Sequence, residues 1–147
     1  MHFFSVLTIL IHSILSGNSK IPDGVHLSGS LTVKISNIKE LKGNMMVAIY
    51  KGDKGFRDPK HVHIYKIIPV NHSKTEVKFE NVSAGEYAIA VYQDLNKNNN
   101  LDLGWFGIPS EPYGFSNNPV ILMGPPSFKD AKFHYGESEK NITVVLN

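Results

Sequence analysis

The chain has 147 residues, of which 41% are hydrophobic and 19% charged, and its formal net charge is +2. A chain of this length forms one domain with a substantial core, but it leaves no room for separate cofactor and substrate modules. Fifteen Lys and Arg are offset by thirteen Asp and Glu, without a basic cluster, so the composition argues against a nucleic-acid partner. The ordinary hydrophobic content excludes the disordered and collagen-like classes.

The N-terminus carries a short apolar run. Residues 3–15 are almost entirely apolar and are followed by a small polar stretch at 16–19. A membrane-spanning helix needs about 20 apolar residues, so the run fits the core of a signal peptide instead. We expect residues 1–19 to be cleaved, which leaves residues 20–147 as a single secreted or periplasmic domain without a membrane span. The alternative is a buried N-terminal strand or helix. The chain contains no Cys, so an exported fold would be held without disulfides.

Beyond residue 25 the chain alternates apolar and polar residues, which is the β-strand period. Short strands with turns every 8 to 12 residues predict an all-β fold, an antiparallel β-sandwich of seven to eight strands that is prealbumin- or immunoglobulin-like. Short helical pieces are expected at 54–58 and 127–132, the second capped by Ser127 with Asp130 at its third position. The predicted strands cover residues 27–35, 45–50, 61–70, 75–79, 86–93 and 141–146, with a further pairing strand near 132–135.

The interval 94–127 breaks this pattern, because it is a long connection without an obvious element. Long connections in compact domains are usually functional when ordered, and the aromatic content here argues for an ordered loop. Its aromatic side chains either form an exposed platform for a protein or carbohydrate ligand or cover one end of the core, and we favour the second arrangement. These candidate ligand-binding residues are Trp105, Phe106, Tyr113 and Phe115.

The start of that interval places a side-chain oxygen at every second residue. A loop that wraps around calcium presents alternate side chains in this way, and calcium prefers six to eight oxygen ligands. Asn99 stands where such loops have a turn Gly, and Trp105 stands where they have a bidentate Glu, so we expect weak affinity. The alternative is a metal-free turn in which Asn side chains cap their own backbone. The candidate calcium ligands are Asp94, Asn96, Asn98, Asn100, Asp102 and Glu111.

Two other arrangements of chemically active residues carry weaker signals. His61 and His63 would share one face of a strand, which is the spacing of a metal-binding pair, but nearby lysines favour a solvated strand face. Asp94, Asp102 and Glu111 would serve a carbohydrate-active enzyme as acid and base, since glycosidases use paired carboxylates. A small sandwich offers little cleft for that reaction, and neither Cys nor a Gly-x-Ser-x-Gly motif is present for nucleophilic catalysis.

Two stretches resemble known families. Residues 77–91, Val-Lys-Phe-Glu-Asn-Val-Ser-Ala-Gly-Glu-Tyr-Ala-Ile-Ala-Val, are similar to the signature of prealbumin-like sandwich modules such as collagen-adhesin B domains and carboxypeptidase regulatory domains. The motifs Gly85-Glu-Tyr-Ala-Ile-Ala-Val-Tyr-Gln-Asp-Leu-Asn, Phe106-Gly-Ile-Pro, Glu111-Pro-Tyr-Gly-Phe-Ser-Asn and Gly124-Pro-Pro-Ser-Phe-Lys-Asp-Ala resemble the uncharacterised bacterial family catalogued as domain of unknown function 2141. This resemblance spans residues 31–146. It implies a small exported bacterial sandwich without an assigned activity.

The sequence therefore predicts an exported, non-catalytic binding or structural module whose long loop binds calcium. A carbohydrate-active enzyme and a metal-free structural module remain the alternatives.

Overall fold

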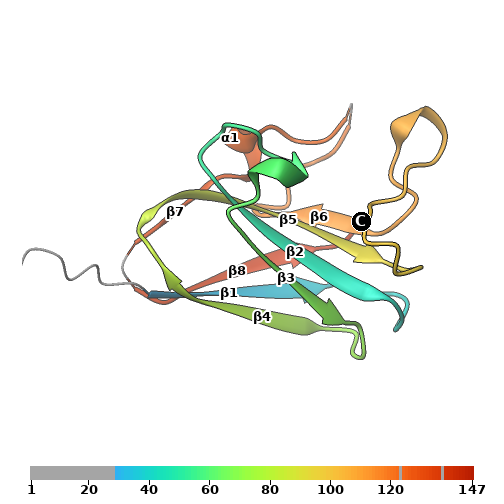
Figure 1. The fold of residues 1–147 in the computed structure, drawn as a ribbon, viewed down its shortest axis with the longest axis horizontal. Helices are drawn as coiled ribbons and strands as arrows, with labels where there is room; N and C mark the ends of the chain where they lie inside the picture. The colour runs from blue at the N-terminus through green and yellow to red at the C-terminus, as the bar shows by residue number, and fades with distance from the viewer. Residues whose placement is uncertain (1–28, 123, 137) are drawn as a thin grey trace, which may run out of the picture.

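The computed structural model describes residues 29–147 except 123 and 137. Its strands form two sheets that face one another (Figure 1). The three-stranded sheet has the order β4-β1-β8, with β1 at Gly29–Ser36, β4 at Thr75–Val82 and β8 at Lys140–Val145. The five-stranded sheet has the order β3-β2-β5-β6, with β7 also paired to β5. Its strands are β2 at Asn44–Lys51, β3 at Ile64–Pro69, β5 at Gly85–Asp94, β6 at Tyr113–Phe115 and β7 at Phe133–Tyr135.

The all-β sandwich is confirmed, but one pairing differs from the antiparallel expectation. Strands β1 and β8 run parallel, in register from the pair of Leu31 and Lys140 to the pair of Ser36 and Val145. The chain reaches β8 from β7, which lies in the other sheet, so no tight hairpin forces β8 to run antiparallel to its neighbour. An alternating pattern specifies which face of a strand is buried, and it does not specify the strand direction.

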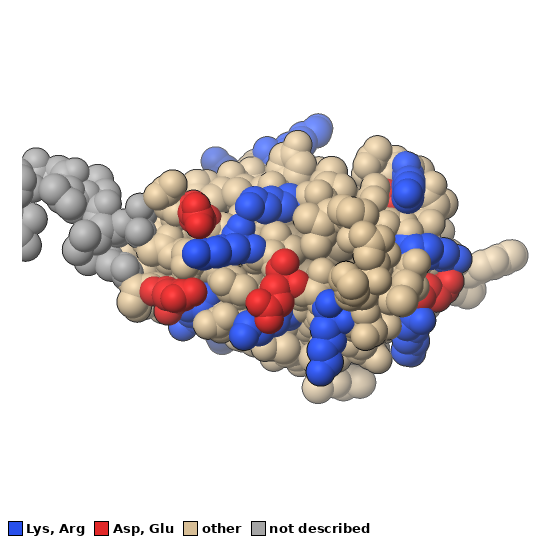
Figure 2. All heavy atoms as spheres, turned by 90° about the horizontal axis from the view of Figure 1, so that it is seen from below, with Lys and Arg blue, Asp and Glu red and all other residues tan. Residues whose placement is uncertain are grey.

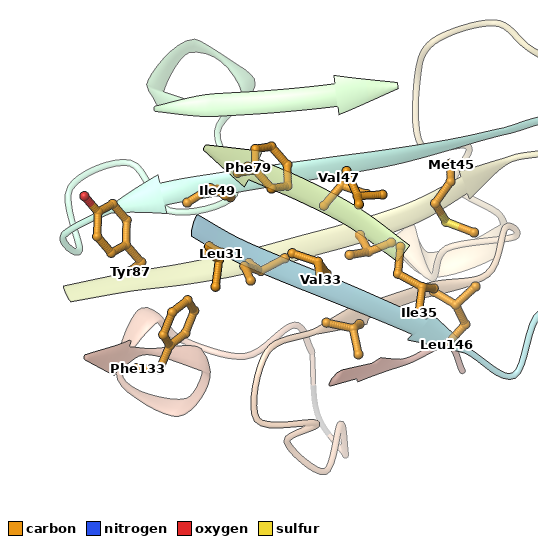
Figure 3. Close-up of a cluster of buried hydrophobic side chains, with 14 of the residues drawn as sticks. Leu31, Val33, Ile35, Met45, Val47, Ile49, Phe79, Tyr87, Phe133 and Leu146 are labelled. Atoms are coloured by element: carbon orange, nitrogen blue, oxygen red, sulfur yellow. The ribbon is translucent and has the colours of Figure 1, made fainter. Parts of the chain in front are cut away.

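The main core fills the space between the two sheets (Figure 3). Leu31, Val33 and Ile35 of β1 point toward Val47 and Ile49 of β2, and all five side chains are essentially inaccessible to solvent. These residues occupy alternate positions, as the period of a strand requires. One end of the core is closed by aromatic rings, with the ring centroids of Tyr87 and Tyr135 6.2 Å apart. The hydrophobic alternation of the sequence therefore sets the core.

A second, smaller apolar cluster covers the outer face of the five-stranded sheet. Ala88 on β5 is small enough to let larger residues pack directly on the sheet. Phe128, from the short helix α1 at Phe128–Ala131, contacts Phe56 with ring centroids 5.7 Å apart, and Phe115 joins the same cluster. The face of β5 opposite the main core is therefore covered by α1 and by loop residues.

The two expected helical pieces have different outcomes. Helix α1 begins after Ser127, and the expected capping box is present, because the Ser127 backbone N–H donates to Asp130 Oδ2 at 2.9 Å. The pKa of the Asp130 carboxyl is lowered first by the hydrogen bond that the Ser127 hydroxyl donates to Oδ2 at 2.6 Å and then by this backbone bond. The expected helix at 54–58 is wrong: the chain forms turns there, with Gly55 and Arg57 in left-handed conformations, and then the 3-10 helix η1 at Pro59–His61. A left-handed residue interrupts a right-handed helix.

The expected signal peptide at residues 1–19 lies outside the described residues, as does the start of the first expected strand at Leu27. Within the part of the chain that the structure describes, no helix has both the length and the apolar character that crossing a membrane requires.

Candidate functional site

Strand β5 ends at the first residue of the candidate calcium loop. Asp94 is fully buried, and its carboxylate accepts two backbone hydrogen bonds. The N–H of Asn98 donates to Oδ1 at 3.1 Å, and the N–H of Asn99 donates to Oδ2 at 2.8 Å. Lys97 and Asn99 take left-handed conformations that turn the chain back toward Asp94. Asn99 thus supplies the sharp turn in place of the usual Gly, because Asn tolerates this conformation.

The loop closes on Asp102, which holds the side chains of two asparagines. Asn96 Nδ2 donates to Asp102 Oδ2 at 2.6 Å, and Asn98 Nδ2 donates to Asp102 Oδ1 at 2.9 Å. The amide oxygens of the same asparagines accept backbone bonds, from Asn98 N to Asn96 Oδ1 at 3.0 Å and from Asn100 N to Asn98 Oδ1 at 2.8 Å. The alternate side chains that the sequence singles out are therefore gathered in one loop.

Glu111 reaches the loop from farther along the chain, as the sequence predicts, and binds its two ends together. The backbone N–H of Leu95 donates to Oε1 at 2.8 Å, and that of Asp102 donates to Oε2 at 3.1 Å. Glu111 is almost fully buried in this position. Both carboxylate oxygens already hold the backbone here, so the contacts of Glu111 are those of a residue that positions the loop.

Two contacts of the loop involve residues outside the pattern of alternate side-chain oxygens. The Tyr92 hydroxyl donates to the carbonyl of Asn99 at 3.2 Å, and the Ser110 hydroxyl donates to the carbonyl of Asp102 at 3.1 Å. Tyr92 lies two residues before Asp94 on the same face of β5, so the strand period could have indicated it. Ser110 is placed by the turn that follows the loop, which no strand period predicts.

The loop concentrates negative charge. Among the described residues, no Lys, Arg or His forms an ion pair with Asp94, Asp102 or Glu111. This charge acts on Tyr92, whose pKa is raised above 10.0 first by burial and then by the carboxylates of Asp94 and Glu111.

Tyr92 provides a direct measure of this charge. The change Asp94→Asn keeps the side-chain shape and removes one negative charge, so the Tyr92 phenolate becomes easier to form and its pKa should fall toward 10. NMR titration of isotope-labelled tyrosine measures this shift. Tyr50 is the internal control, because its raised pKa arises from burial and from Asp58. A Tyr92 pKa that does not move in Asp94→Asn contradicts the electrostatic description of the loop.

The donor set determines which cation the loop would hold. No three side chains of His, Cys, Asp or Glu in the described ranges converge as a metal site, so amide and backbone oxygens would have to complete the coordination. Such an all-oxygen set suits calcium and does not suit zinc or copper. Asn96 and Asn98 now turn their NH₂ groups to Asp102, and both amides would have to rotate to present oxygen to a cation.

The two histidines do not share a strand face. The strand expected from residue 61 begins at Ile64, and His61 lies in η1, where its Nδ1 is 3.0 Å from Asp58 Oδ2. His63 packs beside Tyr87 with ring centroids 5.9 Å apart, and its pKa is lowered by burial and by the charge of Lys51. The geometric basis for a metal-binding pair is therefore missing.

The structure separates the four candidate aromatic residues. Trp105 and Phe106 are 87% and 96% exposed, so the expectation that they cover the core is wrong. They occupy the 3-10 turn η2 at Trp105–Gly107, at the tip of a projecting hairpin. Tyr113 and Phe115 lie in β6, which the sequence does not predict, and Phe115 is buried in the outer cluster. Phe115 therefore has a core position, whereas the hairpin tip is free to contact a ligand.

Two open grooves indent the surface away from the loop. One, of about 390 Å³, lies between β3 and β4, beside Lys66 and Glu80. The other, of about 610 Å³, lies between Arg57 and Lys129 on the side of α1. Neither groove is lined by Asp94, Asp102 or Glu111.

Comparison with known proteins gives a match at the level of the family. No curated protein and no solved structure matches the chain. A family model described as an uncharacterised protein conserved in bacteria matches residues 33–143, which include both sheets, the loop and the aromatic hairpin. The chain therefore belongs to this bacterial family, the domain of unknown function 2141.

Proposed function

We propose that this protein is an exported, non-catalytic sandwich module of the prealbumin-like type whose 94–102 loop binds calcium. One observation carries the proposal: Asp94, Asp102 and Glu111 each form hydrogen bonds to groups of the 94–102 loop, and no cationic side chain of the described residues forms an ion pair with them. A bound divalent cation would supply the ion pairing that these three carboxylates lack among the described side chains.

The roles within the proposed site follow from burial. Asp94 is anchored by β5 and would supply a fixed carboxylate, because each of its oxygens accepts one backbone N–H and keeps a second lone pair for the cation. Asp102 is partly exposed and its carboxylate is held only by side-chain amides, so the carboxylate would turn to the cation when those amides rotate. Asn96 and Asn98 would supply amide oxygens and Asn100 an amide or carbonyl oxygen. Glu111 would keep the two ends of the loop together while the cation binds.

A non-catalytic role is supported by the occupation of the carboxylates. Glu111 and Asp94 direct both oxygens at backbone N–H groups, and a general acid or base needs an oxygen that reaches the substrate. Neither of the two surface grooves gives access to these carboxylates. The loop geometry therefore favours a structural use of its carboxylates over glycoside hydrolysis.

The test is a calorimetric titration with calcium and, separately, with magnesium. We expect a calcium Kd in the range of about 10⁻⁵ to 10⁻³ M, weaker binding of magnesium, and a loss of at least about tenfold in calcium affinity for Asp102→Asn. Asp53→Asn is the matched control, because it removes the same charge from an exposed turn. If Asp102→Asn and Asp53→Asn both bind calcium like the parent, the proposed site is misplaced.

A further inference from the structure

We propose that two apolar loops flanking β6 insert into the interfacial region of a lipid bilayer and dock the sandwich on a membrane surface. The two loops are a hairpin tip at residues 103–109 and a second loop at residues 119–122. This proposal goes beyond calcium binding and does not rest on it, because the contacts that shape both loops form without a cation.

The hairpin tip is apolar and exposed. Residues 103–109 read Leu-Gly-Trp-Phe-Gly-Ile-Pro, with the indole N–H as their one polar side-chain group. Most of the surface of its four large side chains is open to solvent, with Trp105 at 87%, Phe106 at 96%, Leu103 at 61% and Ile108 at 62%. Single exposed apolar residues are ordinary on a protein surface, whereas a contiguous apolar patch marks an interaction site.

The backbone of the tip is hydrogen-bonded within itself. Gly104 N donates to Ile108 O at 2.7 Å, Gly107 N donates to Gly104 O at 3.3 Å, and Ile108 N donates to Trp105 O at 3.4 Å. A segment that enters the apolar part of a bilayer must satisfy its backbone polar groups internally. Phe106 has a φ of 60, a left-handed conformation that is uncommon for an aromatic residue, at the apex of the turn.

The second loop follows β6 and is also apolar and exposed. Val120 and Leu122 are 82% and 85% exposed, and residues 119–122 read Pro-Val-Ile-Leu. Its base is fixed by Asn118, whose Nδ2 donates to Thr143 O at 3.1 Å and whose Oδ1 accepts from Val145 N at 2.8 Å. Both loops rise on the side of the five-stranded sheet that faces away from the three-stranded sheet (Figure 1).

The opposite side of the molecule is charged. Figure 2 shows Lys, Arg, Asp and Glu interspersed over the face below the three-stranded sheet. Surface pairs on this sheet include Lys34 with Glu76 at 3.8 Å and Lys78 with Glu80 at 3.4 Å. An orientation that places the loops in lipid keeps this charged face in water.

The chemistry of the tips favours lipid over the other ligands. A sugar platform needs polar side chains beside its aromatic rings to bond hydroxyl groups, and residues 103–109 supply one indole N–H. A surface that binds a specific protein partner has polar and charged groups around its apolar centre. No charged side chain occurs in either loop. Trp favours the bilayer interface, where its ring is buried and its N–H stays hydrated.

The fluorescence of Trp105 reports on the tip, because Trp105 is the one tryptophan of the chain. The experiment mixes the full-length protein with phosphatidylcholine vesicles, and with phosphatidylglycerol–phosphatidylethanolamine vesicles, in calcium and in chelator. We expect Trp105 emission to shift to shorter wavelength and to be quenched by brominated acyl chains, with and without calcium. The N-terminal apolar run does not confound this measurement, since the emission and quenching report on residue 105.

The variant Phe106→Asn keeps Trp105 and replaces the apex with a polar residue that tolerates the left-handed conformation. We expect the lipid-dependent quenching of Trp105 to fall at least about fivefold. Leu41→Ala is the matched control, because it removes an exposed apolar side chain, 58% accessible, from the connection between β1 and β2. In Leu41→Ala, brominated acyl chains should quench Trp105 emission as strongly as they do in the parent.

Two outcomes overturn the proposal. Trp105 emission that is unchanged on both vesicle types excludes insertion of the tip. A blue shift that depends on protein concentration and not on lipid assigns the tip to contact with a second protein molecule instead. Failure of the calcium proposal is distinguishable from both, because it appears as absent calcium binding in calorimetry while the lipid-dependent quenching persists in chelator.

Discussion

The variant Asp94→Ala is expected to lower the free energy of unfolding by about 2–3 kcal/mol and to lose the stabilisation that calcium provides. The methyl group of Ala cannot accept the N–H groups of Asn98 and Asn99, and hydrogen bonds to a charged acceptor each contribute about 1.5–3 kcal/mol. We expect less than the summed range of about 3–6 kcal/mol because Asn98 and Asn99 are exposed, so water can replace the acceptor that their N–H groups lose. The core strands should stay folded, since Asp94 is the last residue of β5.

Denaturant unfolding of the parent and Asp94→Ala, each in calcium and in chelator, separates the two parts of this effect. The difference in chelator measures the lost backbone contacts, and the difference between the two conditions measures the lost cation. Asp53→Ala is the control, because Asp53 is an exposed acidic residue in the turn after β2 and lies outside the loop. If calcium raises the free energy of unfolding of Asp94→Ala by as much as it raises that of the parent, Asp94 is not a ligand.

A second large effect is expected at Gly43, which lies just before β2 and packs against the start of the loop. Its φ of 74 is in the left-handed region, and an added Cβ would come against the carbonyl oxygen of Asp94 and within 2.8 Å of Leu95 Cα. The left-handed conformation costs Ala about 1–2 kcal/mol, and overpacking adds about 1–3 kcal/mol. Because the clash is with backbone, we expect Gly43→Ala to destabilise the protein by about 3–5 kcal/mol.

The control for Gly43 is Gly52, which has a φ of 72 but no atom within 4 Å of the added Cβ. Gly52→Ala should therefore cost about 1–2 kcal/mol, the left-handed penalty alone. The pair isolates the backbone contact between Gly43 and the loop, and thermal or denaturant unfolding measures both. Equal destabilisation by the two substitutions would mean that the chain around Asp94 yields to the added methyl group.

Much of the fold was predictable because β-strand burial follows a period of two. Leu31, Val33 and Ile35 alternate in the sequence and are buried in the structure. The cap of α1 was also predictable, because Ser127 and Asp130 form a local contact that depends only on their spacing.

Features that depend on distant contacts were not predictable. The direction of β8 is decided by its path from the other sheet, and the three residues of β6 are too few to show a period. The exposure of Trp105 and Phe106 also had no local signal, since a buried lid and a projecting tip have the same composition.

The 94–102 loop also combines features that the local sequence predicts with features that depend on distant contacts. Alternate oxygens from Asp94 to Asp102 come together because a tight turn follows from local Asn and Asp chemistry. The arrival of Glu111 was expected from the missing carboxylate, but its hold on the N–H groups of Leu95 and Asp102 depends on the return of the chain into β6. Spacing along the chain indicates which groups can meet, and long-range packing decides which atoms they contact.

The central claim, that calcium occupies the 94–102 loop, is tested most directly by thermal unfolding of the protein with calcium, with magnesium and with chelator. Binding to the folded state alone stabilises by about 2.7 kcal/mol at a hundredfold excess over Kd, which corresponds to a rise in Tm of several degrees. We predict this rise with calcium at a hundredfold excess over the Kd that calorimetry gives, and a smaller rise or none with magnesium. The same Tm in calcium and in chelator would contradict the claim and would leave the loop as an asparagine-rich turn held by its own hydrogen bonds.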